Sequence, residues 1–108
     1  MSDIKTVDDT VDPANCQTMA EVRDGVDTID RALVALMARR FGYMDAAARI
    51  KPGRETVRDE DRKAQVIANV KARASELGVP VPLAAALWEM LVENSIAYEL
   101  IRYDETRG

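Results

Sequence analysis

The sequence predicts an all-α protein: a chain of three helices with one long N-terminal helix, paired with a second copy of itself. Apolar residues make up 47% of the 108 residues and aromatic residues only 5%, with Ala, Val and Leu supplying most of the apolar content. That balance favours helices over strands. Apolar positions recur at helical spacing in three segments, and no alternating strand pattern or internal repeat is present.

The first 17 residues differ from the rest of the chain. Residues 1–17 are polar, acidic and without period, so we expect a flexible N-terminal tail to which the sequence assigns no function. At Thr18 the pattern changes, because Thr18 and Glu21 have the spacing of a capping box. We therefore expect one helical domain over residues 18–108, which is the domain count that this length supports.

The first predicted helix carries an apolar stripe with alternating steps of three and four residues, as in a coiled-coil seam. The stripe consists of Val22, Val26, Ile29, Leu33, Leu36, Tyr43 and Ala47, and Arg40 completes it. No proline occurs before Pro52, so we expect about 30 residues of helix, roughly 45 Å long. The remainder of one chain cannot cover such a helix, which predicts a homodimer.

Two further helices follow. Pro52-Gly53 ends the first helix, and Thr56-Val57-Arg58-Asp59 is a second cap-like start. The second helix stops at Gly78, and the third runs from about Pro82 to Tyr103. One face of the second helix holds Val66, Ile67, Val70, Ala74 and Leu77. One face of the third holds Leu87, Leu91, Ser95 and Glu99, with Trp88 and Val92 beside them.

Charge and composition exclude several classes of function. A net charge of −4 and a pI near 4.8 oppose binding to nucleic acid or to an anionic membrane. Histidine is absent, which removes the commonest general base and metal ligand, and we expect no metal or cofactor. The lone Cys16 cannot form an intrachain disulfide. Neither a signal peptide nor a transmembrane run is evident, so we expect a cytoplasmic protein.

Charged residues interrupt the apolar stripes. Arg40 lies in the seam, and Lys51 lies 11 residues later on the same face. The plainer interpretations are a snorkelling arginine and a lysine that complements the helix dipole. Arg23 is 17 residues before Arg40, roughly 25 Å along the helix, so one small ligand can contact both only across an antiparallel dimer.

The other two helices add polar groups to this set. Arg58 and Arg62 are four residues apart with Asp59 between them, and Ser95 and Glu99 are one turn apart. Each alone is compatible with a solvated helix face or with a serine bonded to its own helix. Their occurrence together with Arg40 and Lys51 favours a binding site.

Three segments carry a resemblance to a known family. EVRDGVDTIDRALVALMARRFGYMDAAARIK at 21–51, VRDEDR at 57–62 and ENSIAYE at 93–99 resemble the all-helical class of chorismate mutases. The resemblance implies three-helix chains intertwined as a homodimer with two equivalent active sites. It also implies conversion of chorismate to prephenate, a pericyclic rearrangement that needs no nucleophile, base, metal or cofactor.

The resemblance assigns roles to the catalytic residues that we predict. Arg40 would bind one substrate carboxylate and the partner's Arg23 the other. Lys51 would reach the ether oxygen and a carboxylate, and Glu99 stands where the family has glutamine or glutamate beside the ether oxygen. Glu99 can donate a hydrogen bond only when protonated. We therefore expect activity to weaken with rising pH and Glu99→Gln to be active with a flatter pH profile.

The resemblance also implies further contacts to the substrate. Asp59 would face the ring hydroxyl, Arg62 would close the site, and Ser95 would assist at a carboxylate. The sequence departs from the family pattern at Lys63, where a glutamate often contacts the ring hydroxyl.

Alternative functions remain open. The stretches YMDAAARIK and IAYELIRYDETRG also resemble isochorismate pyruvate lyase, a relative with the same fold. VRDEDR, Ser95 and Glu99 favour the mutase. The sequence leaves open whether the product serves the synthesis of aromatic amino acids or of a siderophore. A non-catalytic helical dimer is an alternative of another class. A pure dimerisation helix, however, has no reason to keep Arg40 in its seam. Nucleic-acid binding is opposed by the net charge.

Overall fold

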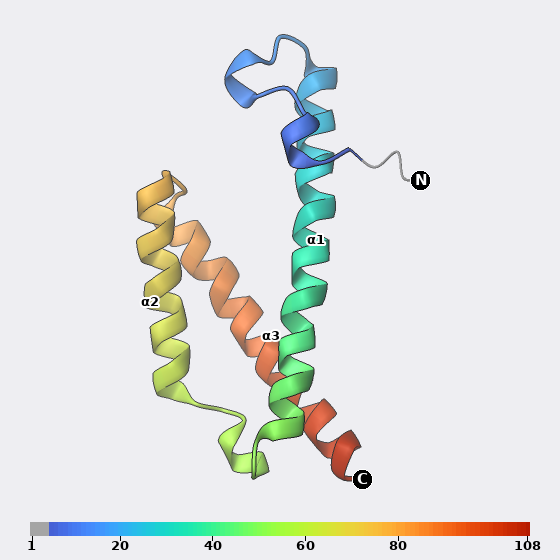
Figure 1. The fold of residues 1–108 in the computed structure, drawn as a ribbon. Coiled ribbons are helices and arrows are strands. Elements are labelled where there is room, and N and C mark those ends of the chain that lie inside the picture. Colours follow the sequence, from blue (N-terminus) through green and yellow to red (C-terminus); the bar gives the residue numbers. More distant parts are fainter. Residues whose placement is uncertain (1–4) are drawn as a thin grey trace. The chain divides into compact units, whose positions relative to one another are not determined.

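The computed structural model describes residues 5–108, and residues 1–4 of the predicted tail lie outside the described residues (Figure 1). Its elements are η1 (Val7–Asp9), η2 (Pro13–Asn15), α1 (Met19–Ile50), η3 (Arg54–Thr56), α2 (Glu60–Leu77) and α3 (Val81–Arg107). Residues 5–108 contain no strand, so the prediction of an all-α chain with one long N-terminal helix is confirmed. By internal contacts the chain forms two units, one ending at Phe41 and one covering Gly42–Gly108.

The start and end of α1 follow the sequence signals. The Glu21 amide donates to Thr18 Oγ1 over 3.1 Å, and the Thr18 amide donates to Glu21 Oε1 over 3.1 Å. This is the predicted reciprocal capping box. The helix then continues for 32 residues to Ile50, two residues before Pro52. The residue before a proline is disfavoured in the helical conformation, which explains the end point.

The described part of the predicted tail contains two single 3₁₀ turns, η1 and η2. The Thr6 amide and hydroxyl both donate to Asp9, and Asp12 accepts from the Ala14 amide. Lys5 Nζ lies 2.9 Å from Asp24 Oδ2 of α1. The flexibility of the tail and the single domain over residues 18–108 both stay predictions.

The predicted start of the second helix is wrong by one turn. Thr56 does not cap α2, because its hydroxyl donates backwards to the Gly53 carbonyl at 2.6 Å and closes η3. Asp59 is the cap instead, and its Oδ1 accepts from the Arg62 amide over 3.0 Å. The helix ends as predicted at Gly78, whose φ of 76° is the left-handed conformation that glycine tolerates best.

Helices α2 and α3 lie side by side as a hairpin (Figure 1). Helix α3 extends one turn beyond the predicted end at Tyr103, to Arg107. The core of this unit is small: Val57, Val92 and Ile96 are buried together, and partly buried side chains pack against them. These are Val66, Ile67, Trp88, Leu100 and Tyr103.

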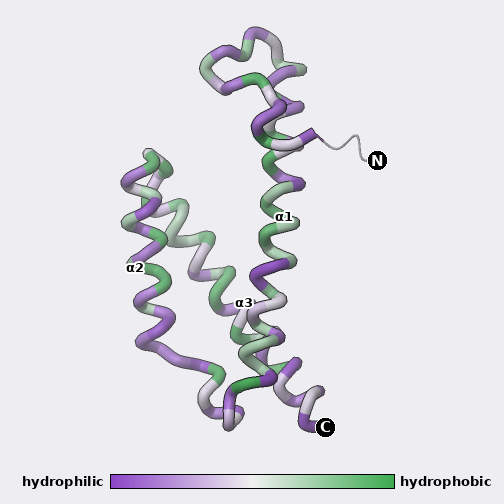
Figure 2. The backbone as a smooth tube through the Cα atoms, in the orientation of Figure 1, coloured by the Kyte–Doolittle hydropathy of each residue, from purple (hydrophilic) through white to green (hydrophobic). Residues whose placement is uncertain are grey.

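Much of the apolar surface of the chain is exposed. Hydrophobic positions recur along α1 between polar ones (Figure 2), and Leu33 is 50% exposed and Leu36 64% exposed. Leu77 and Leu87, which the sequence places on the apolar faces of their helices, are also more than half exposed. Within residues 5–108, no helix has the length and apolarity that crossing a membrane requires.

Candidate active site

An ion pair between Lys51 and Glu99 is the centre of the candidate site. Lys51 is the first residue after α1, and its Nζ lies 2.8 Å from Glu99 Oε2. The same ammonium group donates to the Val57 carbonyl over 3.2 Å. The Glu99 side chain is 5% exposed and the Lys51 side chain 28%, so the pair has one buried and one accessible end.

Glu99 is buried because it lies on the inner face of α3. Ser95 and Ile96, one turn and nearly one turn earlier on this helix, are buried as well. The contact between Glu99 Oε2 and Lys51 is close enough for an ion pair but lacks hydrogen-bond alignment, and no other donor within residues 5–108 reaches this oxygen. A buried carboxylate without full hydrogen bonding is costly, and such groups concentrate at functional sites.

The Lys51 ammonium has a donor to spare. An ammonium group carries three N–H bonds. Within the described residues, the group donates one hydrogen bond to the Val57 carbonyl and lies at ion-pair distance from Glu99. This leaves donor capacity for a ligand. The site can therefore place a cationic donor, and beside it a buried carboxyl, against an oxygen atom of a ligand.

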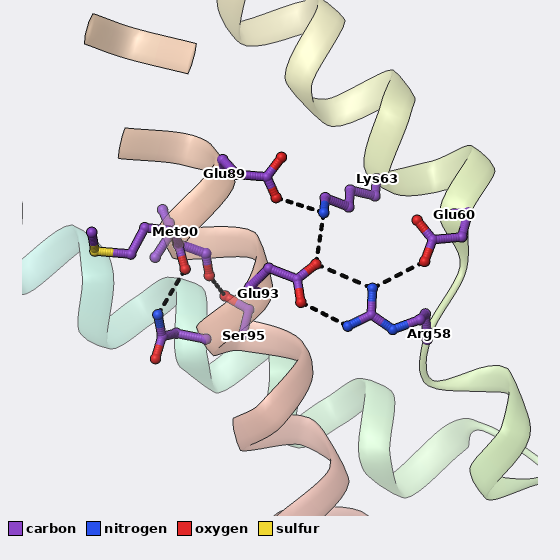
Figure 3. A network of polar contacts seen from close by, with 9 residues as sticks. Arg58, Glu60, Lys63, Glu89, Met90, Glu93 and Ser95 are labelled. Carbon is purple, nitrogen blue, oxygen red and sulfur yellow. Dashed lines mark hydrogen bonds and ion pairs between the residues drawn. The ribbon is translucent and has the colours of Figure 1, made fainter. Parts of the chain in front are cut away.

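The position of the Val57 carbonyl is set by packing and by charge. Val57 is only 3% exposed, and the neighbouring Arg58 forms two hydrogen bonds to Glu93 of α3, Nη2 to Oε1 over 2.7 Å and Nη1 to Oε2 over 3.1 Å (Figure 3). Two parallel bonds of this kind fix orientation as well as distance. The segment before α2 is thus attached to α3.

Lys63 belongs to the same network. Its Nζ pairs with Glu89 and with Glu93 Oε2, the latter at 2.7 Å (Figure 3). Hydrogen bonds from Arg58 and then Lys63 lower the pKa of Glu93 to about 2, and hydrogen bonds from Glu89 and Glu93 raise the pKa of Lys63. Lys63, where the sequence departs from the family pattern, therefore pairs with carboxylates of its own chain.

The structure places the other predicted contact residues as follows. Asp59 and Arg62 are exposed at the start of α2, and the Arg62 guanidinium donates to Gln65 Oε1 over 2.6 Å. Ser95 is buried, and its hydroxyl donates to the Leu91 carbonyl of its own helix over 2.7 Å. Substrate roles for these three residues stay predictions.

The two remaining arginines lie on the part of α1 that belongs to the first unit. Arg23 is exposed and Arg40 is half-buried. The structure thus brings together Lys51 and Glu99 from distant parts of the sequence. It also joins Asp59 to the Arg62 backbone, while the roles predicted for Arg23 and Arg40 stay predictions.

Sequence reasoning missed several groups that support the site. Among them are the Val57 carbonyl, Glu93 and a cluster around Asp45, which accepts from Tyr98 Oη over 2.8 Å and from Arg102 Nε over 3.0 Å. The hydrogen bonds from Tyr98 and then Arg102 lower the pKa of Asp45. These partners are more than 50 residues apart in sequence, so no local pattern indicates the pairing.

Comparison with known proteins agrees with this geometry. Residues 22–100 match the family described as chorismate mutase type II. The chain is also 28% identical over 96 residues to isochorismate pyruvate lyase of Pseudomonas aeruginosa, an alignment that covers 89% of this chain and 95% of that protein. Because the family match spans most of the sequence, and includes Lys51, Glu99 and every other predicted site residue, the chain belongs to the chorismate mutase type II family.

Proposed function

We propose that this protein is a chorismate mutase, which converts chorismate to prephenate in the cytoplasm. The observation that carries the proposal is the Lys51–Glu99 pair, in which the glutamate side chain is 5% exposed and the lysine side chain 28% exposed. In this rearrangement a carbon–oxygen bond breaks as a carbon–carbon bond forms within one molecule, and negative charge grows on the ether oxygen. A donor fixed where that charge develops lowers the barrier.

The two members of the pair contribute differently. Lys51 supplies the third N–H of its ammonium to the ether oxygen. Glu99 supplies a second hydrogen bond when its carboxyl is protonated, because an ionised carboxylate only accepts and opposes the developing charge. Nothing in this mechanism requires a histidine, which the sequence lacks.

The cations of α1 complete the proposed site. Arg40 binds one substrate carboxylate, and the partner's Arg23 binds the other, holding the flexible dianion in its reactive conformer. Asp59, Arg62 and Ser95 bind the remaining polar groups of the substrate. The Arg58 and Lys63 charges are matched by Glu93 and Glu89, so these two cations do not compete for the dianion.

A homodimer is part of the proposal. Only six hydrophobic side chains are buried within residues 5–108, and three of them are alanines. Val22, Val26 and Ile29 of the seam line a hollow of about 610 Å³ in the first unit, together with Val7, Val11 and other residues of the N-terminal segment. Further along the seam, Leu33 and Leu36 are at least half exposed, and a second copy of this chain packs there with its own equally apolar seam.

Isochorismate pyruvate lyase activity is the second candidate. It is favoured by the relative from Pseudomonas aeruginosa, which aligns with this chain over nearly its whole length. Both reactions need a small dianion held beside a cationic donor, so the pair of Lys51 and Glu99 suits either.

The test is to incubate the purified protein separately with chorismate and isochorismate from pH 5 to 8 and to identify the products by chromatography. We expect prephenate from chorismate. Glu99→Gln should remain active, because its amide donates a hydrogen bond from the same position. Salicylate and pyruvate from isochorismate, with little prephenate, would make the lyase the correct assignment. Turnover of neither substrate would favour the non-catalytic dimer.

A further inference from the structure

The last turn of α3 makes a contact with the end of α1 that has no part in the proposed mechanism. The Arg107 guanidinium donates from Nη1 to the Ala48 carbonyl and from Nη2 to the Lys51 carbonyl, both over 2.7 Å. It also lies over the Tyr103 ring, 3.8 Å from the ring centroid. One side chain of α3 thus reaches the backbone of the residue that carries the catalytic ammonium.

The contact of Arg107 is strong for an exposed arginine, because its charged donors meet carbonyls at the C-terminal end of a helix. The last four carbonyls of a helix have no partner in their own helix, and the negative end of the helix dipole favours a cation there. Hydrogen bonds from a charged donor are shorter and stronger than neutral ones. The planar fork of arginine is rigid, so it holds both carbonyls in one geometry, and the Tyr103 ring supports its face.

Contacts at both ends of Lys51 limit the movement of its ammonium group. Lys51 directly follows α1: its amide still donates to the Ala47 carbonyl over 2.9 Å, and its carbonyl leads into the segment before α2, which lies outside the helix. Its side chain is held at the far end by Glu99 and the Val57 carbonyl. Arg107 holds the near end, at the backbone carbonyl. With both ends held, the ammonium has little freedom to leave the position that faces the ligand.

We propose that Arg107 is a positioning residue for Lys51: by binding the Ala48 and Lys51 carbonyls, it fixes the backbone from which the catalytic ammonium extends. The proposal rests on the proposed function, in which Lys51 acts on the reacting oxygen and the arginines of α1 bind the substrate carboxylates. Arg107 itself touches no reacting atom and acts through Lys51.

Arg54 provides a matched control within the same region. It is also an exposed arginine that joins the segment after α1 to the last turns of α3, with Nε 2.9 Å from Asp104 Oδ1. Its bond goes to a side chain at the surface and not to a carbonyl of Lys51. Exposed pairs of this kind contribute little to stability. Loss of Arg54 therefore loosens the same surface without releasing the Lys51 backbone.

The kinetic test compares Arg107→Ala, Arg107→Lys and Arg54→Ala. We expect kcat to fall about tenfold to 100-fold in Arg107→Ala, because displacement of a catalytic group by about 1 Å has effects of that size. KM should change far less, since the arginines on α1 bind the carboxylates. Arg107→Lys should fall between the two, because an ammonium group cannot bind both carbonyls in the same fork. Arg54→Ala should retain the parent kcat and KM.

A second measurement does not depend on turnover. In ¹⁵N-lysine NMR spectra, the ammonium signal of Lys51 is assigned by its loss in Lys51→Gln. We expect that signal to shift and broaden in Arg107→Ala and to stay unchanged in Arg54→Ala, with helix content checked by circular dichroism. If the parent protein turns over neither substrate, the proposed function fails while the NMR comparison still tests Arg107.

Two results would overturn the positioning role. One is an unchanged Lys51 signal in Arg107→Ala together with an unchanged kcat where the parent is active. The other is an equal loss in Arg54→Ala, which would mean that any attachment of this segment to α3 serves as well. Should Arg107→Ala fail to fold, Arg107→Lys carries the same comparison.

Discussion

The first half of α1 and the α2–α3 hairpin differ in which side chains they bury. On α1, apolar residues of the seam such as Val26 and Leu33 are half exposed. On α3, by contrast, even a carboxylate, Glu99, is buried, and it is paired with Lys51. The unit that contains the hairpin thus holds both members of the ion pair within one chain. In the proposed homodimer, a second copy covers the seam of α1.

Much of the positive charge around the hairpin is balanced by carboxylates of the same unit. Around the hairpin, Arg58 and Lys63 have carboxylate partners on α3 at hydrogen-bond distance. This matching offsets the positive charge of these two side chains within the chain itself.

The largest effect is expected from Lys51→Gln, which removes the cation of the Lys51–Glu99 pair. We predict that kcat falls about 100-fold to 1,000-fold, the usual consequence of losing one donor to a developing oxyanion. Removing one partner also leaves Glu99 buried without its cation, so the melting temperature should fall. Steady-state kinetics and thermal melts measure both effects.

Two variants make that prediction specific. Lys71→Gln, the same replacement at an exposed position of α2, should leave kcat unchanged. Combining Lys51→Gln with Glu99→Gln removes both members of the pair and should recover stability without recovering activity. If Lys51→Gln retained more than a tenth of the parent kcat, Lys51 would not be the donor to the ether oxygen.

The next effect concerns the other region, the exposed stripe of α1. Leu33→Asp places a carboxylate in the seam, where pairing with a second copy would bury it at a cost of several kcal/mol. We predict that the dimer Kd rises by about 100-fold or more. Activity should fall with it, because the partner's Arg23 is withdrawn. Analytical ultracentrifugation across a range of protein concentrations measures the dissociation.

Val34→Asp is the matched control for the stripe. Val34 is adjacent in sequence and 68% exposed, but it lies off the three-and-four spacing of the seam. The same carboxylate should be harmless there. A parent protein that is monomeric at micromolar concentration, or equal dissociation in both variants, would contradict the proposed interface.

The smallest effect is expected from Glu93→Gln, which tests charge matching in the hairpin unit. The pKa of Glu93 is lowered from 4.5 to about 2 in the folded chain. A carboxyl with a lowered folded pKa adds stability above its unfolded value, and that stability is lost as pH falls through the folded value. The parent should therefore melt higher than Glu93→Gln at pH 7, and the difference should shrink between pH 4.5 and pH 2.

The effect at Glu93 should be modest, because its side chain is 39% exposed and solvent screens the charge. Glu76→Gln, which removes the surface partner of Arg73, is the control and should show no such pH-dependent difference. A gap in melting temperature that is the same at pH 3 and pH 7 would mean that Glu93 acts by packing and not by charge.

Several features of this fold follow from local signals and could be predicted. The capping box at Thr18 and Glu21 sets the start of α1, Pro52 sets its end, and Gly78 ends α2. Each depends on the conformational limits of a few adjacent residues. The start of α2 was misplaced because Thr56 and Asp59 are both good caps. Only the backward bond from Thr56 to Gly53 decides between them.

The candidate site divides in the same manner. Lys51 and Glu99 were identified from sequence, because charged residues interrupt apolar stripes there and because the segments resemble a known family. The sequence did not predict that these two residues, 48 positions apart, form an ion pair. Nor did it predict the hydrogen bonds from Lys51 to the Val57 carbonyl and from Arg107 to the carbonyls at the end of α1. A cation in the last turn of a helix looks like an ordinary complement to the dipole of its own helix.

The sequence by itself thus determined the three helices, the start of α1, the end of α2 and the residue types available for chemistry, since these depend on neighbours within a few positions. The tertiary structure decided which charges pair with one another, as Glu93 does with Arg58 and Lys63, and Lys51 with Glu99. The physical reason is that burial and pairing depend on side chains from distant segments, whose approach is a property of packing and leaves no periodic trace in the chain.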